Sequence, residues 1–178
     1  MKRLIIISIF ATLSIFTSLA QEVGRQKGSI SINAGIGVST FEAVNQASKT
    51  VLPPVKLEID YTVACFSKDM SLSAGAYYGM SVESIPIDGA SETSYLLGPM
   101  ATYRCAIIDK LDFYVKGILG VKCLSARGVA EDRTLRDFGL GYGLYLGGTW
   151  YFTPKLGLGA ELGYGGPANL GIHLAINL

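Results

Sequence analysis

The sequence has little of what catalytic, metal-binding and nucleic-acid-binding sites are made of. It holds one histidine in 178 residues, and none of its cysteines belongs to a Cys-x-x-Cys pair or stands beside that histidine. The 15 Lys and Arg residues nearly balance the 14 Asp and Glu residues, so no basic excess points to nucleic acid. The phosphate-loop pattern GxxxxGK[ST] does not occur. We therefore expect no cofactor, no metal site and no nucleic-acid partner.

The cysteines are too few and too far apart to form a disulfide framework. There are three, Cys65, Cys105 and Cys123, and an odd, widely spaced set is not the pattern of a small disulfide-stapled domain. Each falls at the strand parity of its apolar neighbours. We interpret them as small apolar side chains on the outer face of a sheet.

Long apolar runs are also scarce, and the clearest one lies at the N-terminus. Lys2 and Arg3 precede an apolar run from Leu4 to Phe16, and small residues end it at Ser18 and Ala20. This is the pattern of a secretory signal peptide over residues 1–20, with residues 21–178 as a single mature domain. The alternative is a retained membrane anchor, for which the run is short.

What the sequence does contain is a two-residue alternation. In residues 55–63 every second side chain is apolar, whereas the side chains between them include Lys56, Glu58 and Asp60. Successive side chains of a β-strand point to opposite faces, so this segment predicts a strand with one apolar and one charged face. The same alternation predicts eight strands in all, at residues 29–38, 55–63, 70–80, 95–104, 112–122, 138–150, 156–164 and 170–178.

Two of these segments need comment. Residues 138–153 carry no charge and could pass for a membrane helix, but they contain five glycines, each of which costs about 1 kcal/mol in a helix interior. We predict a strand there. Pro99 lacks a backbone donor, so we expect a bulge in the strand at residues 95–104.

The connections alternate between long and short. Long loops are predicted at residues 39–53, 81–94 and 124–137, and short turns at 66–69, 108–110 and 153–155. Strands of this length with long loops on one side are typical of bacterial outer-membrane barrels, whose long loops face outside. The charges of the second and third loops are expected to be solvated, with a partner or lipid headgroups as the alternative. They are Glu83, Asp88, Glu92, Arg127, Glu131, Asp132, Arg133, Arg136 and Asp137.

Taken together, the segments predict an all-β fold, an eight-stranded antiparallel up-and-down transmembrane β-barrel after a cleaved signal peptide. Closure leaves no unpaired strand edge in the bilayer, and an even strand number places both termini in the periplasm. A soluble barrel with an apolar interior would need the opposite polarity. Buried charges must pair, so we predict a structural charge network in the lumen. Its members are Lys56, Glu58, Asp60, Arg104, Asp112, Lys116, Lys122, Glu161 and His173.

One side of the predicted barrel interior is a wall that consists mainly of glycine. The strands at 138–150 and 156–164 point mostly glycine inward, and we expect this wall to leave room for the long side chains of residues 55–63, with Tyr145 in the middle. Eight strands enclose only enough space for side chains. The lumen is therefore predicted to be a packed polar core.

The alternating glycines and aromatics from Gly139 to Tyr164, followed by an alternating last strand, resemble the small eight-stranded outer-membrane barrels of the OmpA/OmpX type, the porin-family outer-membrane β-barrel domains. The resemblance covers residues 21–178. It implies an outer-membrane location in a Gram-negative bacterium, contact with outer-membrane lipids, and insertion by the barrel-assembly machinery. That machinery usually reads a terminal aromatic residue, whereas this chain ends in Leu178.

Members of that family differ in function, and fold alone does not choose among them. One hypothesis is a monomeric structural or surface-interaction barrel, with an extracellular partner of unknown identity at the long loops. The other is a narrow small-solute channel. A lipid-modifying enzyme is a remote alternative, since a barrel deacylase would carry His-x-Ser facing lipid, whereas His173 faces inward and residue 175 is alanine. We predict no enzymatic activity, and a hydrogen bond between His173 and Glu161.

Overall fold

The computed structural model describes residues 26–38, 49–84, 91–108, 110–127 and 135–178. The predicted signal peptide lies outside these residues, as do Asp88, Glu131, Asp132 and Arg133. Within the described part of the chain, no helix has the length and apolar character needed to cross a membrane.

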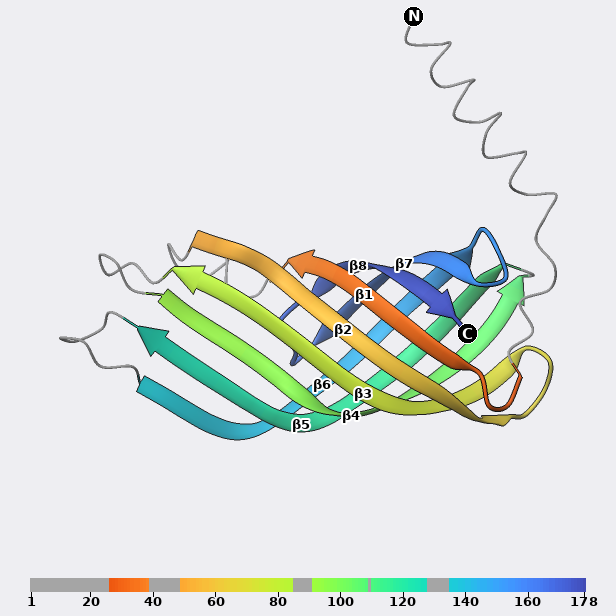
Figure 1. The fold of residues 1–178 in the computed structure, drawn as a ribbon, viewed down its shortest axis with the longest axis horizontal. Helices are drawn as coiled ribbons and strands as arrows, with labels where there is room; N and C mark the ends of the chain where they lie inside the picture. The colour runs from red at the N-terminus through yellow and green to blue at the C-terminus, as the bar shows by residue number, and fades with distance from the viewer. Residues whose placement is uncertain (1–25, 39–48, 85–90, 109, 128–134) are drawn as a thin grey trace, which may run out of the picture.

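The structure is an antiparallel barrel of eight strands, each bonded to its neighbours in sequence and closed by the pairing of the first strand with the last (Figure 1). This confirms the predicted all-β fold, an eight-stranded antiparallel up-and-down barrel. The strands are β1 (Ile30–Val38), β2 (Lys49–Cys65), β3 (Met70–Ser84), β4 (Ser91–Ile108), β5 (Leu111–Arg127), β6 (Leu135–Tyr151), β7 (Leu156–Tyr164) and β8 (Leu170–Asn177).

Alternation along each strand sorts the side chains between two environments. On β2, Lys56, Glu58 and Asp60 are buried inside the barrel, whereas Leu57 and Ile59 are exposed on its outer surface. The outward face of the other strands is likewise a belt of exposed leucine, isoleucine, valine and aromatic residues. The polarity is therefore the reverse of a soluble protein, with charges inside and apolar groups outside.

Five consecutive strands are longer than predicted. Strands β2 to β6 have 15–18 residues each, against nine or fewer in β1, β7 and β8. Figure 1 shows them reaching past the ends of the short strands on the side of the long loops. We call this extension the β2–β6 wall.

The β2–β6 wall corrects the predicted loop boundaries. The charged residues Glu83, Glu92, Arg127, Arg136 and Asp137 were assigned to loops, but they lie on β3, β4, β5 and β6. The sequence pattern missed them because the apolar alternation weakens there, although the hydrogen-bonded pairing continues.

The predicted short turn at 66–69 lies where the sequence placed it. The segment 66–69 joins β2 to β3, and 165–169 joins β7 to β8, with Gly165 at a φ of 91° that favours glycine. The predicted bulge at Pro99 is wrong, since Pro99 pairs with Ala76 in an unbroken register and the irregularity lies instead between Ala106 and Ile108.

The described cysteines are free thiols, as expected, with Cys105 and Cys123 at apolar-face positions. A register shift between Thr62 and Ala64 alters the parity of the end of β2, so that Cys65 pairs with Ser71, whose side chain is buried in the lumen. The assignment of Cys65 to the outer face therefore needs correction, because a bulge changes which residues share a face.

We predict that Gly120→Ala destabilises the barrel. A Cβ on Gly120 would meet the Leu97 carbonyl oxygen and the Cα of Gly98 on β4, both of them backbone atoms, so the two strands would have to separate. Crowding of this kind costs about 1–3 kcal/mol. The measurement is a urea titration of the folded fraction in lipid vesicles.

Gly117→Ala is the matched control on the same strand, because a Cβ there meets no atom within 4 Å. Equal stability of the two variants would show that the close approach of β4 and β5 has no energetic consequence.

Candidate functional site

The centre of the lumen holds four interlocked charges. Lys56 and Glu58 come from β2, Lys116 from β5 and Glu161 from β7, so three separate strands supply them. The Lys56 Nζ lies 2.5 Å from Glu161 Oε1 and 3.1 Å from Glu58 Oε1. The Lys116 Nζ lies 2.8 Å from Glu161 Oε2 and also pairs with Glu58 Oε1. Each lysine thus contacts both carboxylates, and we call these residues the ion cluster.

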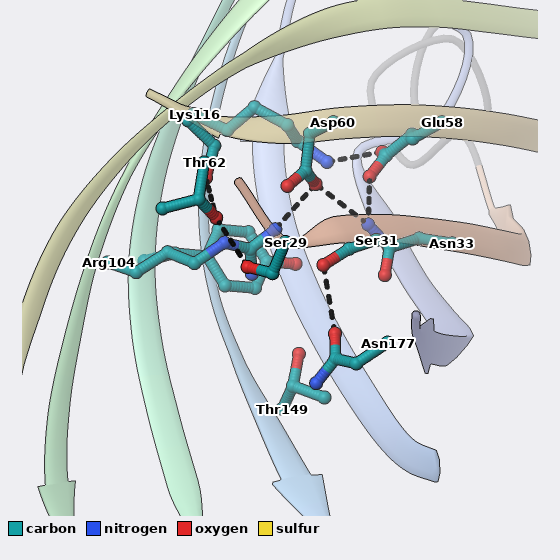
Figure 2. Close-up of polar contacts among 12 residues, drawn as sticks. Ser29, Ser31, Asn33, Glu58, Asp60, Thr62, Arg104, Lys116, Thr149 and Asn177 are labelled. Atoms are coloured by element: carbon teal, nitrogen blue, oxygen red, sulfur yellow. Dashed lines mark hydrogen bonds and ion pairs between the residues drawn. The ribbon is translucent and has the colours of Figure 1, made fainter. Parts of the chain in front are cut away.

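A second pair extends the charges toward the short turns (Figure 2). The Arg104 guanidinium donates to Asp60 Oδ2 over 2.8 Å, and both residues are buried. Asn33 joins the two groups, since its Nδ2 lies 3.3 Å from Glu58 Oε2 and 3.4 Å from Asp60 Oδ2. Asp112 is buried in the lumen and acts electrostatically on Arg104.

His173 does not make the predicted bond to Glu161. The β7–β8 register sets His173 opposite Gly159 and Glu161 opposite Gly171, so the two side chains are offset by two residues. The His173 Nε2 instead shares a hydrogen bond of 3.1 Å with Thr149 Oγ1 on β6. Glu161 accepts a 2.7 Å bond from the Tyr114 hydroxyl in addition to its two lysines.

An apolar layer lies in the lumen beside the ion cluster, and Tyr145 is a member that was predicted there. It consists of Tyr77, Leu96, Met100, Ile118 and Tyr145, all of which are buried. The Tyr77 and Tyr145 rings are stacked with centroids 6.4 Å apart, and the Lys116 Nζ lies 5.1 Å from the Tyr145 centroid and 5.9 Å from the Tyr77 centroid. The predicted packed polar core is therefore corrected, since the lumen also contains an apolar layer. Leu96 and Ile118 occupy inward positions of their strands, and this is the signal that could have revealed the layer.

The glycines of β6 and β7 make room mainly for rings. A Cβ on Gly163 would collide with the Tyr145 ring, one on Gly159 with the His173 ring, and one on Gly147 with the Tyr114 hydroxyl. The prediction that this wall accommodates the charged side chains of β2 is thus corrected. Each ring lies over the glycine that is paired with it on the neighbouring strand, because glycine has no side chain there.

Lys122 lies apart from the other predicted network members. It lines a pocket of about 200 Å³ at the loop end, together with Glu83, Glu92, Ser94 and Asn169. Lys122 is six residues beyond Lys116 on β5, with the inward-pointing Ile118 of the apolar layer between them. A shared inward parity could not reveal this separation, because it says nothing about depth in the barrel.

The geometry gives the ion cluster little capacity for chemistry on a ligand. Its lysines and carboxylates contact one another and are nearly inaccessible, with Lys116 1% and Glu58 3% exposed. The described residues contain no group of three or more His, Cys, Asp and Glu side chains placed to hold a metal ion. The cluster is arranged to neutralise charge inside the barrel.

No protein-family model matches the chain, and no curated protein matches it either. Solved structures of several proteins resemble the barrel, and three of them are described. The N-terminal β-barrel domain of Pseudomonas aeruginosa OprF has 18% identity and a TM-score of 0.52, covering 86% of this chain and 100% of that one. A de novo designed transmembrane β-barrel has 15% identity and a TM-score of 0.53, covering 87% and 99%.

The third is Ail, the attachment invasion locus protein of Yersinia pestis, solved in complex with the heparin analogue sucrose octasulfate. It has 11% identity and a TM-score of 0.50, covering 85% of this chain and 96% of that one. At such identities the similarity concerns the fold alone. The chain has the fold of small eight-stranded outer-membrane β-barrels.

We predict that Lys116→Met lowers the free energy of unfolding by about 3–5 kcal/mol, because it leaves two buried carboxylates with one lysine between them. Combining it with Glu58→Gln should recover part of the loss, since the double variant restores the charge balance. Urea titration of the folded barrel in vesicles measures both effects.

Lys155→Met is the control, because Lys155 is an exposed residue in the turn between β6 and β7. If Lys116→Met were as stable as Lys155→Met, the ion cluster would have no role in stability.

Proposed function

We propose that the protein is an integral protein of the bacterial outer membrane whose lumen is closed by its own side chains. Its role is then structural or concerns interactions at the cell surface, carried by the loop end of the barrel. The proposal includes no catalytic role for His173 and a periplasmic location for both termini.

The outer surface supports placement in a membrane. Exposed apolar side chains surround the barrel, and aromatic residues lie near both ends of the strands, as in transmembrane barrels. At the loop end, Tyr142 and Tyr164 are neighbours with ring centroids 6.3 Å apart, and Tyr78 and Tyr95 are 6.5 Å apart. At the turn end, Phe66 and Tyr103 are 6.5 Å apart. On β6, Leu144 and Leu146 are exposed at positions between Tyr142 and Trp150.

The single observation that carries the closed lumen is the ion cluster stacked against the apolar layer. Lys116 of β5 contacts Glu58 of β2 and Glu161 of β7, and the Tyr77 and Tyr145 rings lie beside it. A continuous water path would need an opening through both groups. Eight strands leave no spare width for one.

Membrane placement predicts the cost of a charge in the belt. Leu146 lies on β6, midway between Tyr142 and Trp150. An arginine at this position would lie near the bilayer midplane. Leu146→Arg should lower stability in vesicles by about 2–4 kcal/mol. Val51→Arg should change it by about 0–1 kcal/mol, because Val51 is an exposed residue near the loop end of β2. Equal effects would argue against this orientation in the bilayer.

A closed lumen predicts no stable ion conductance. The purified protein is inserted into planar bilayers, and single-channel current is recorded under a holding potential. The same sample is run on a gel with and without heating, since a folded barrel migrates differently from the unfolded chain. We expect a heat-modifiable band and no reproducible openings. Reproducible openings from a heat-modifiable sample would instead identify a narrow small-solute channel.

A further inference from the structure

The outer face of the β2–β6 wall carries a basic, hydroxyl-rich hollow at the loop-end edge of the apolar belt. It has a volume of about 510 Å³, and its lining includes Arg127, Arg136, Ser91, Thr93 and Ser125. We call it the arginine hollow. The function proposed above makes no use of it.

Strand register arranges the hollow in layers. Thr93, Ser125 and Arg136 form one cross-strand row, and Arg127 lies beside Ser91 one step further from the barrel. The next outward row toward the barrel is Tyr95, Cys123 and Phe138, and the row after that is Leu97, Val121 and Leu140. Along the wall, the outer face thus changes from guanidinium and hydroxyl groups to aromatic rings and then to aliphatic side chains.

The wall separates charge between its two faces. Glu83 and Glu92 line the 200 Å³ pocket at the loop end, on the inner face of the wall. Asp137 lies between Arg136 and Phe138 on β6, both of which line the arginine hollow, so Asp137 is on the inner face as well. The arginines are therefore on the face opposite these acids. Among the residues that the structure describes, neither Arg127 nor Arg136 has an ion-pair partner, and both are exposed.

We propose that the arginine hollow binds the phosphate group of an anionic membrane lipid, with the lipid's acyl chains lying along the apolar rows beneath it. The inference rests on the membrane placement proposed above. Guanidinium groups bind phosphate oxygens in pairs of charge-assisted hydrogen bonds, and the neighbouring hydroxyls add donors.

The occupant is a lipid rather than a free anion because the hollow continues into exposed apolar surface. Phe138 is 65% exposed and Leu140 77% exposed. They are the next two outward residues after Arg136 along β6, toward the centre of the barrel. A phosphate held at the arginines would place the attached hydrocarbon against these two side chains. A free anion would use none of this surface.

The test is lipid retention by the full-length protein in detergent micelles, followed by native mass spectrometry. The protein is titrated with dioleoyl phosphatidic acid or, as the zwitterionic comparison, with dioleoyl phosphatidylcholine. We expect phosphatidic acid to be retained preferentially. Arg127→Gln combined with Arg136→Gln should weaken its retention at least about tenfold, because charge-assisted hydrogen bonds are lost.

The matched control replaces two exposed lysines at the other end of the barrel, Lys68→Gln with Lys155→Gln, which changes the net charge equally and should leave retention unchanged. Phe138→Ser should weaken retention of phosphatidic acid while both arginines remain. Inorganic phosphate added at the concentration of the lipid should displace little of it.

Retention that is the same in the arginine and lysine variants, or equal for the two lipids, would overturn the proposal. Efficient displacement by inorganic phosphate would also overturn it, because the site would then bind an anion without its lipid. Each variant is checked for a heat-modifiable band. Loss of lipid selectivity in a heat-modifiable barrel therefore contradicts this inference and leaves the proposed membrane barrel standing.

Discussion

The structure depends on neutralising charge inside a narrow closed sheet. An isolated charge in a low-dielectric interior is very unfavourable, and a buried ion pair is tolerated only when its geometry and hydrogen bonds are good. The ion cluster meets this requirement with two lysines and two carboxylates, each contacting both opposite charges. Since β2, β5 and β7 each supply part of it, the cluster also ties together strands that are not neighbours in the sheet.

The remaining lumen is filled by rings facing glycine. Tyr145 lies against Gly163, Tyr114 against Gly147 and His173 against Gly159. Each large ring thus lies next to a glycine on the neighbouring strand. This complementarity lets an eight-stranded barrel hold both an aromatic layer and a charged layer. The same complementarity supports the proposed closed lumen, because Tyr77 and Lys116 are each only 1% exposed.

The loop end departs from the symmetry of the barrel. Five strands continue beyond the three short ones, and the added wall has acids on its inner face and arginines on its outer face. The proposed surface role therefore has two chemically different places to act, a pocket at the mouth and the arginine hollow on the outer face. Neither involves the ion cluster, which lies deeper in the barrel.

The sequence by itself determined the number of strands, the face on which most side chains lie and the tight turn at 66–69. It could do so because the period of a strand is two and the apolar side chains keep to one parity along each strand. It could not determine the depth of a side chain along the barrel axis. For this reason it placed Lys122 with Lys116, and it paired His173 with Glu161 although the register offsets them by two residues.

Only the tertiary structure decided the lengths of β2 to β6 and the presence of the apolar layer. In the β2–β6 wall the apolar alternation weakens while strand pairing continues, so no sequence pattern reveals the strands at Arg127 and Arg136. Inside the barrel, Tyr77 of β3 and Tyr145 of β6 come from strands that are not neighbours, and their contact depends on register and closure. Contacts between distant strands are set by the stagger of the whole sheet, which no single segment of the sequence encodes.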